Sequence, residues 1–183
     1  MPHSLNTDSV IESMFVVQGL VHGSKSFCGK HKIVNGEENR NDYDWFYYFG
    51  WLKSQISERL IKSSITLRML EDTLSEHQED VDLNEYRKVA VSGLVLGEIQ
   101  KGKFNLTLRE AQNKIIHATD IALDWIEESD YEYWSGDIFL MGRKYKDEWV
   151  LKLNVESFAI ATNRFINSLG EEVDWYHLYK YDT

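Results

Sequence analysis

Cysteine, proline and long apolar runs are all scarce in this chain. Its 183 residues include one cysteine, Cys28, and one proline, Pro2. A single cysteine cannot form an internal disulfide, so nothing in the sequence requires an oxidising compartment. No apolar run reaches the roughly 18 residues that a membrane span needs, and the first residues lack the basic and apolar regions of a signal peptide. We therefore expect a cytoplasmic protein with no membrane segment.

Positive charge is also in short supply. The chain has 20 Lys and Arg against 30 Asp and Glu, a formal net charge of −10, which disfavours phosphate binding over the whole surface. Residues 115–142 contain seven carboxylates and no Lys or Arg. If the basic residues met in space, they would still form a local site for an anion. They fall into three groups: Lys25, Lys30 and Lys32; Lys101, Lys103, Arg109 and Lys114; Arg143, Lys144 and Lys146.

The composition indicates one folded domain over residues 1–183, since 43% of the residues are hydrophobic and 13% aromatic. Ser9 followed by Glu12 is a capping-box pattern and predicts a first helix. We expect that helix to end at Gly19 or Gly23. Residues 22–43 are then expected to form a long polar loop, of a length that is often functional.

Two further helices are predicted by their start signals. Asp44 can cap a long helix through about His77, because apolar residues recur there at helical spacing. Asp82 with Glu85 repeats the capping box and begins a helix that we expect to stop near Gly102. Both segments favour a mainly helical protein.

The pattern changes after residue 129. Trp149, Leu151 and Leu153 alternate with other residues in period two, and residues 134–154 are predicted to form a β-hairpin with a polar connection. Residues 158–169 then return to helical spacing. The predicted fold is a mainly α, antiparallel helical bundle with a small β-hairpin near the C-terminus, and the aromatic tail is expected to pack on the body or on a partner.

The most informative segment is a predicted helix over residues 108–128, opened by Thr107 and Glu110 as a third capping box. Its polar residues recur at spacings of three and four and therefore share one helical face. This polar stripe is either a functional site or solvated surface. It consists of Arg109, Asn113, His117, Asp120 and Asp124.

Arg109 and His117 on such a helix, preceded by the aromatic segment 44–51, resemble the HEPN superfamily, and residues 113–118 are similar to a segment of small bacterial proteins that follow the helix with a hairpin. The resemblance covers about residues 44–128. It implies a HEPN-like helical domain and a metal-independent ribonuclease without a cofactor, of the toxin–antitoxin or phage-defence type. It also implies that Arg and His of two chains form one site. This chain has more residues between Arg109 and His117 than family members typically have.

As a ribonuclease site, the stripe would use His117 as general acid or phosphate donor, with Asn113 and Arg109 as partners. Asp120, three residues after His117, would favour imidazolium and so allow proton donation near neutral pH. Lys114 is a nearer cation than Arg109. The macrodipole disfavours a cation in the first turn, so helix stability does not explain Arg109. RNA is the substrate that this hypothesis implies.

The alternative is a non-catalytic acidic interaction protein, such as an antitoxin, an immunity protein or a phage-encoded inhibitor. The net charge and the cation-free stretch 115–142 would complement a basic nuclease. In either case we expect no metal and no cofactor, because two weaker metal patterns lack a full ligand set. These are His22, Cys28 and His31, and His117 with Asp120 and Asp124.

A ribonuclease site built from two chains requires a homodimer. The abundant Trp and Tyr residues would supply an interface. We expect helix 108–128 to lie near a two-fold axis in an antiparallel crossing. Arg109 and Lys114 of one chain would then face the acidic end of the same helix in the other chain, which offsets the repulsion between like charges.

Overall fold

The computed structural model describes residues 6–36, 43–77 and 81–173, without the side chains of residues 171–172. Within these ranges the protein is a mixed α/β fold, with five helices packed against a four-stranded antiparallel sheet. The predicted mainly helical bundle is therefore wrong. The helices are α1 (Thr7–His31), α2 (Trp45–His77), α3 (Leu83–Ala90), α4 (Leu108–His117) and α5 (Val155–Glu172); the strands are β1 (Gly97–Lys101), β2 (Asp120–Glu127), β3 (Glu132–Lys144) and β4 (Asp147–Asn154).

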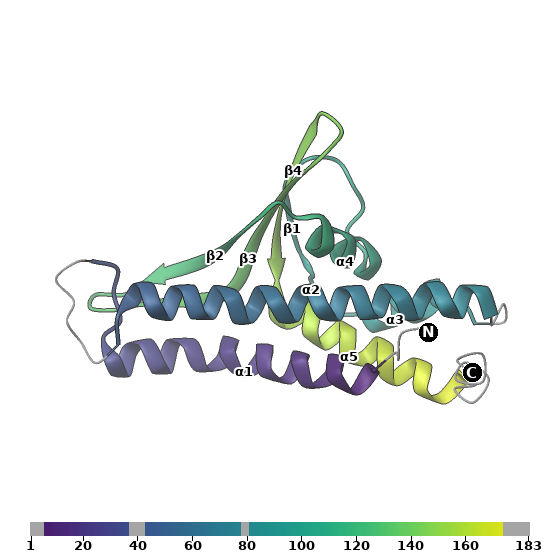
Figure 1. Ribbon diagram of the computed structural model, residues 1–183, viewed down its shortest axis with the longest axis horizontal. Helices are drawn as coiled ribbons and strands as arrows, with labels where there is room; N and C mark the ends of the chain where they lie inside the picture. Colours follow the sequence, from purple (N-terminus) through teal and green to yellow (C-terminus); the bar gives the residue numbers. More distant parts are fainter. Residues whose placement is uncertain (1–5, 37–42, 78–80, 174–183) are drawn as a thin grey trace.

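Figure 1 shows the long helices α1, α2 and α5 side by side beneath the sheet, with the β3–β4 turn projecting away from them. The core lies between these two layers. Along the central strands every second side chain is buried against the helices, whereas the intervening ones are half-buried. The buried set includes Trp134, Ile138, Leu140, Trp149, Leu151 and Leu153. No helix in the described ranges is long and apolar enough to span a membrane.

Helix α1 is much longer than predicted. It is capped by Asn6, whose side-chain oxygen accepts from the Ser9 backbone N–H at 3.0 Å, and not by Ser9 itself. The helix continues through Gly19 and Gly23, so the loop predicted over residues 22–43 is wrong for residues 22–31. A helical glycine costs only about 1 kcal/mol relative to alanine, which tertiary packing outweighs. The buried residues of α1 continue past both glycines: Val10, Met14, Val17, Ser24 and Cys28.

Helix α2 follows the prediction, with the Asp44 carboxylate accepting from the Tyr47 backbone N–H at 3.0 Å. Helix α3 also begins as predicted, since the Asp82 carboxylate accepts from the N–H groups of Asn84 and Glu85. It ends at Ala90, however, and not near Gly102. Gly93 has φ +74, a conformation that favours glycine and turns the chain toward β1.

The hairpin predicted over residues 134–154 is present as β3 and β4, but it forms the centre of a larger sheet. The strand order is β1-β4-β3-β2, with all neighbours antiparallel. The chain then enters α5, where the Asn154 side chain accepts from the Ser157 N–H at 2.8 Å. The helix predicted over residues 158–169 lies within α5. The aromatic tail after residue 173 lies outside the described residues.

The helix predicted over residues 108–128 ends eleven residues early, at His117. Thr107 caps α4 as expected, by accepting from the Glu110 N–H at 3.1 Å. Helix α4 stops at His117, and residues 120–127 form β2. Ile121 and Leu123 are buried in that strand. In a continuous helix, Ile121 and Leu123 would lie off the predicted apolar face. In β2, pairing with β3 places both side chains in the core.

Candidate functional site

Arg109 serves to join α4 to α2. Its guanidinium donates to Glu71 Oε2 at 2.5 Å and to Asp72 Oδ1 at 2.7 Å. Glu71 is 1% exposed and also accepts from Arg87 Nη2 of α3 at 2.6 Å. The Gln112 side chain donates to its second oxygen at 3.3 Å. A buried carboxylate needs such partners to offset its desolvation, so Arg109 has a structural task.

Asn113 continues this network. Its side-chain oxygen accepts from Arg68 Nη1 at 2.7 Å, and its amide donates to Glu110 Oε2 at 3.2 Å. Burial alone would raise the pKa of Asp72, but hydrogen bonds and charges from Arg109 and Arg68 outweigh it and hold that pKa below its usual range. The first half of the polar stripe thus packs α4 against α2.

His117 lies apart from these residues. It is exposed at the last position of α4, and within the described ranges it forms no hydrogen bond or ion pair with Arg109 or Asn113. Asp120 is no longer on the same helix; it lies 3.7 Å from Lys53 Nζ and accepts from the Ile121 N–H. The structure therefore does not bring the three predicted catalytic residues together within one chain. The composite site across two chains stays a prediction.

The acidic stretch 115–142 is largely neutralised by lysines from other segments. The hydrogen bond to Glu128, with a further one to Tyr133, raises the pKa of Lys25. These pairs weaken the argument that the stretch offers an uncompensated acidic surface to a basic partner. The paired residues are Asp120 with Lys53, Asp124 and Asp137 with Lys152, Glu128 with Lys25, and Asp130 with Lys32.

The metal patterns do not converge either. His22 Nε2 lies 2.9 Å from Glu156, the His31 ring packs on Phe27 and Tyr43, and Cys28 is buried. Burial raises the pKa of the Cys28 thiol, which disfavours the thiolate that a metal requires. The described residues contain no group of three or more His, Cys, Asp or Glu that could hold a metal ion.

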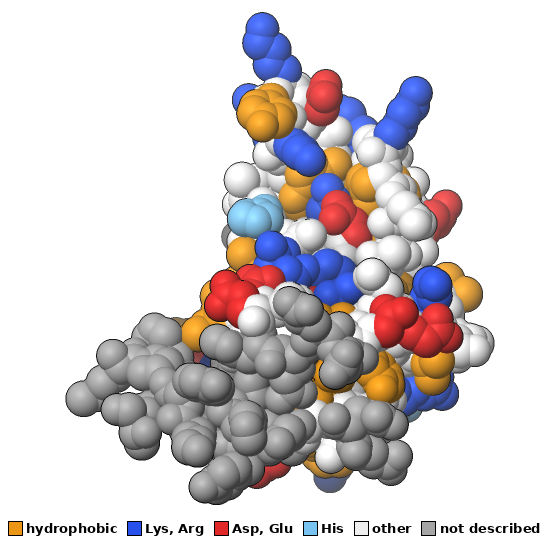
Figure 2. Space-filling model, turned by 90° about the vertical axis from the view of Figure 1, so that its right-hand side faces the viewer, with side chains coloured by type: hydrophobic (Ala, Val, Ile, Leu, Met, Phe, Trp, Pro, Cys, Tyr) orange, Lys and Arg blue, Asp and Glu red, His pale blue; other side chains and the backbone are white. Residues whose placement is uncertain are grey.

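A cleft of about 760 Å³ lies between the end of β1, the β3–β4 turn and α4. It unites two of the basic groups noted in the sequence, and we refer to it as the basic cleft. Figure 2 shows Lys and Arg side chains grouped at the upper end of this face, near the β3–β4 turn, with hydrophobic side chains between them. The lysines that line it are Lys101, Lys103, Lys114, Lys144 and Lys146.

The five lysines exceed the three carboxylates of the basic cleft, Glu110, Asp147 and Glu148. Lys101 Nζ lies 2.7 Å from Glu148, and Arg143 lies 3.0 Å from it; these hydrogen bonds hold the pKa of Glu148 below its usual range. Lys103, Lys144 and Lys146, which also line the cleft, form no ion pair within the described residues. Three ammonium groups are therefore available to a ligand: Lys103, Lys144 and Lys146.

Lys114 lies at the base of the basic cleft and is 8% exposed. Its ammonium is 4.1 Å from the centre of the Phe104 ring, 4.3 Å from that of Trp149 and 3.3 Å from Glu110. Gly142 allows this packing, because a Cβ there would lie 2.2 Å from the Trp149 ring. The cleft thus has an aromatic wall with a positive charge held against it.

Tyr145 completes the set at the tip of the hairpin, where it is 90% exposed. Tyr145 lies in the polar connection of the predicted hairpin, and the sequence analysis did not predict that aromatic residues would line a cleft. The overlooked signal is a run of lysines interleaved with aromatic residues, Lys103-Phe104 and Lys144-Tyr145-Lys146. Such interleaving is typical of sites that bind single-stranded nucleic acid.

No family model, curated protein or solved structure compared with this chain matches it. The resemblance to the HEPN superfamily therefore stays a prediction.

Proposed function

We propose that this protein is a non-catalytic, cytoplasmic binding protein that holds a short single-stranded RNA segment in the basic cleft. One observation carries the proposal: five lysines and three aromatic rings line a single cleft on a protein of net charge −10. Proteins that bind single strands combine a positive groove for the backbone with aromatic rings for the bases.

The residues divide these tasks. The ammonium groups of Lys103, Lys144 and Lys146 contact backbone phosphates and release their counterions, which supplies the salt-dependent part of the affinity. The exposed ring of Tyr145 stacks on a base, since it lacks a cover within the described residues. Lys114 acts from the base of the cleft as a fixed positive charge.

The acidic remainder of the surface limits the bound segment to the cleft. Phosphates outside it would meet a protein with an excess of ten negative charges. A cleft of about 760 Å³ is within the usual range of ligand pockets and holds only a few nucleotides. Short single strands are therefore favoured over duplexes, whose stacked bases cannot reach Tyr145.

Binding without cleavage is proposed because Arg109 is engaged by Glu71 and Asp72. A guanidinium that neutralises a buried carboxylate is not available to a transferring phosphate. His117 lies three residues beyond Lys114, so it is within one helical turn of the basic cleft. Cleavage by His117 is accordingly the outcome against which the proposal is tested.

The experiment measures fluorescence anisotropy of a labelled ten-residue oligouridylate over a series of salt concentrations, in EDTA. The test variant replaces Lys103, Lys144 and Lys146 by Gln. A matched control replaces three lysines outside the basic cleft by Gln, and therefore makes the same change in net charge: Lys53, Lys62 and Lys88.

The cleft variant should bind at least tenfold more weakly, and its log–log salt slope should fall by about 2, at roughly 0.7 per phosphate contact. The control should keep both values. Equal weakening in the two variants, or no binding by the wild type at low salt, overturns the proposal. A gel of the same samples should show intact RNA. Degradation that His117→Ala abolishes would instead support the ribonuclease prediction.

A further inference from the structure

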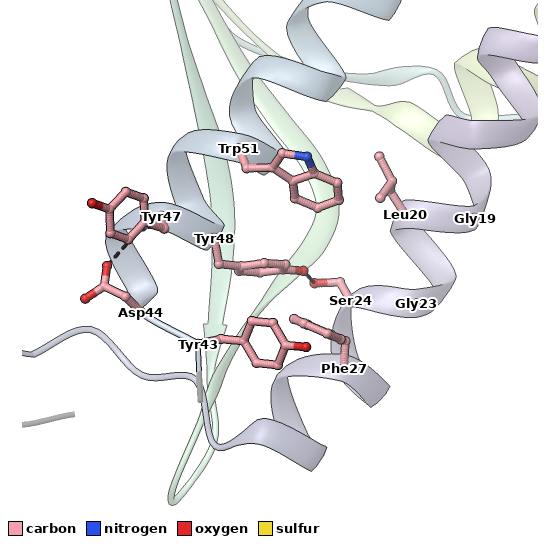
Figure 3. Close-up of a pocket in the computed structure, with 10 residues that line it drawn as sticks. All are labelled: Gly19, Leu20, Gly23, Ser24, Phe27, Tyr43, Asp44, Tyr47, Tyr48 and Trp51. Atoms are coloured by element: carbon pink, nitrogen blue, oxygen red, sulfur yellow. Dashed lines mark hydrogen bonds between the residues drawn. The ribbon is translucent and has the colours of Figure 1, made fainter. Parts of the chain in front are cut away.

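A second cavity lies far from the basic cleft, on the outer side of the α1–α2 pair. It measures about 460 Å³, and we call it the aromatic groove. Figure 3 shows the rings of Phe27, Tyr43, Tyr48 and Trp51 gathered along it, with Leu20, Gly19 and Gly23 on the α1 side. Trp51 is 50% exposed, a large apolar surface for a residue that borders a cavity. Such patches mark interaction sites.

The groove is almost free of charge. Asp44 is its one ionisable side chain other than tyrosine among the described lining residues, and its carboxylate already caps α2 by accepting from the Tyr47 N–H. The hydroxyls of Ser24 and Tyr48 lie 3.4 Å apart and satisfy each other. An uncharged surface on a protein of net charge −10 is a place where two copies can approach without bringing like charges together.

Gly19 and Gly23 have no role inside the chain. Their φ angles are those of an ordinary helix, and an added Cβ would meet nothing within 4 Å. Each nevertheless lowers helix propensity relative to alanine. Both are exposed at the edge of the aromatic groove. Glycines at this spacing allow a second helix to approach closely.

Charges on α1 are arranged symmetrically about these glycines. Glu12 lies nine residues before residue 21 and Lys30 nine residues after it, or about 13.5 Å on either side at 1.5 Å per residue. Glu12 lies seven residues before Gly19, and Lys30 lies seven residues after Gly23. These spacings place the two charged residues and the two glycines on one helical face. Both charged residues are exposed and have no ion pair within the described ranges.

We infer that the protein forms a two-fold homodimer in which α1 crosses α1 of a second copy in antiparallel fashion, centred between Gly19 and Gly23. In that register Glu12 of each copy faces Lys30 of the other, giving two ion pairs. Trp51, which lies opposite Gly19 and Leu20 in Figure 3, is level with the crossing point. The two aromatic grooves then lie on the same side of the crossing, and the second copy covers each of them.

This interface replaces the one predicted from the sequence, because the helix ends at His117 and Arg109 at its start is paired with Glu71 and Asp72 of α2. It does not rest on RNA binding, since the basic cleft and the aromatic groove share no residue. A dimer without RNA affinity and an RNA-binding monomer would therefore be separate results.

The test is sedimentation equilibrium of the full chain from 1 to 100 µM, with charge-swap variants. Glu12→Lys alone and Lys30→Glu alone should each weaken the dimer at least tenfold. The double swap should restore it, and a mixture of the two single variants should form a heterodimer. Glu76→Lys, on the exposed side of α2, is the control and should leave the dimer unchanged.

The glycines supply an independent test, in which the stability of the monomer and the affinity of the dimer should change in opposite directions. Gly19→Ala with Gly23→Ala should raise the helical stability of the monomer but weaken the dimer at least tenfold, because the added methyls hold the helices apart. A wild-type chain that is monomeric at 100 µM overturns the inference. A dimer that the single charge swaps leave intact, or that the double swap fails to restore, also overturns this register.

Discussion

The buried carboxylate of Glu71 should be the most sensitive charged position in this protein. It joins three helices, because it accepts from Arg87 of α3 and from Arg109 and Gln112 of α4 while it belongs to α2. Glu71→Gln keeps the shape but removes the charge. It leaves Arg87 without its anionic partner and Arg109 with Asp72 alone. The folded state should therefore lose stability although no cavity is created.

The magnitude follows from burial. Breaking a fully buried ion pair costs about 3–5 kcal/mol. Arg87 and Arg109 keep 16% and 21% of their side chains exposed, so water can take up part of their charge. We expect a loss of about 2–3 kcal/mol in the free energy of unfolding for Glu71→Gln, equivalent to roughly 4–12 °C in Tm for a chain of this size. Arg109→Gln leaves Glu71 its other partners and should cost about 1–2 kcal/mol.

The assay is urea unfolding at pH 7, followed by tryptophan fluorescence. Glu76→Gln, exposed on the same helix, is the matched control and should change stability by less than about 0.5 kcal/mol. The decisive result is which variant, Glu71→Gln or Arg109→Gln, loses more unfolding free energy. If Arg109→Gln cost more than Glu71→Gln, Glu71 would not be the most sensitive charged position. If both variants matched the control, the structural role assigned to Arg109 and Glu71 would be refuted.

Three further outcomes can be checked in the same system. The pKa of Asp72 lies below its ordinary 3.8, so its charge stabilises the fold above that pH and the stabilisation is lost as the pH falls through the lower folded value. In urea unfolding, the stability difference between the wild type and Asp72→Asn should therefore stay nearly constant from pH 7 to just above pH 3.8 and shrink as the pH falls below that value. Gly142→Ala should cost about 1–3 kcal/mol in the same unfolding assay, because the new Cβ would overlap the Trp149 ring. Finally, Cys28 in the native protein should react with a thiol reagent far more slowly than in urea, measured by absorbance, since burial both covers the thiol and raises its pKa.

Local signals in the sequence predicted helix starts well. Asp44, Asp82 and Thr107 all cap helices as expected, because a side-chain oxygen at this position depends only on neighbouring N–H groups. The end of a helix depends on what packs against it. Gly19 and Gly23 suggested an end to α1 that contacts with α2, α5 and β3 prevent.

The missed strands have a common cause. Residues 118–126 are compatible with both a helical and a two-residue period. Pairing with β3, whose partner residues lie 5 to 21 positions later in the chain, selects the strand. β1 has few apolar residues and becomes a strand only through its pairing with β4. For the same reason the burial of Glu71 could not be predicted from its neighbours in the sequence, since its partners come from two later helices.

The hairpin geometry also bears on how this protein can change. Between Gly142 and Trp149, which are buried, all six residues are exposed; they comprise the end of β3, the turn and the start of β4, and they lie beyond the helical layer (Figure 1). These residues supply much of the charge of the basic cleft, but none of them belongs to the hydrophobic core. Mutations there should alter ligand preference at almost no thermodynamic cost. The turn is accordingly the place where this fold can diversify, and where a new specificity can be grafted, while the scaffold beneath it stays the same.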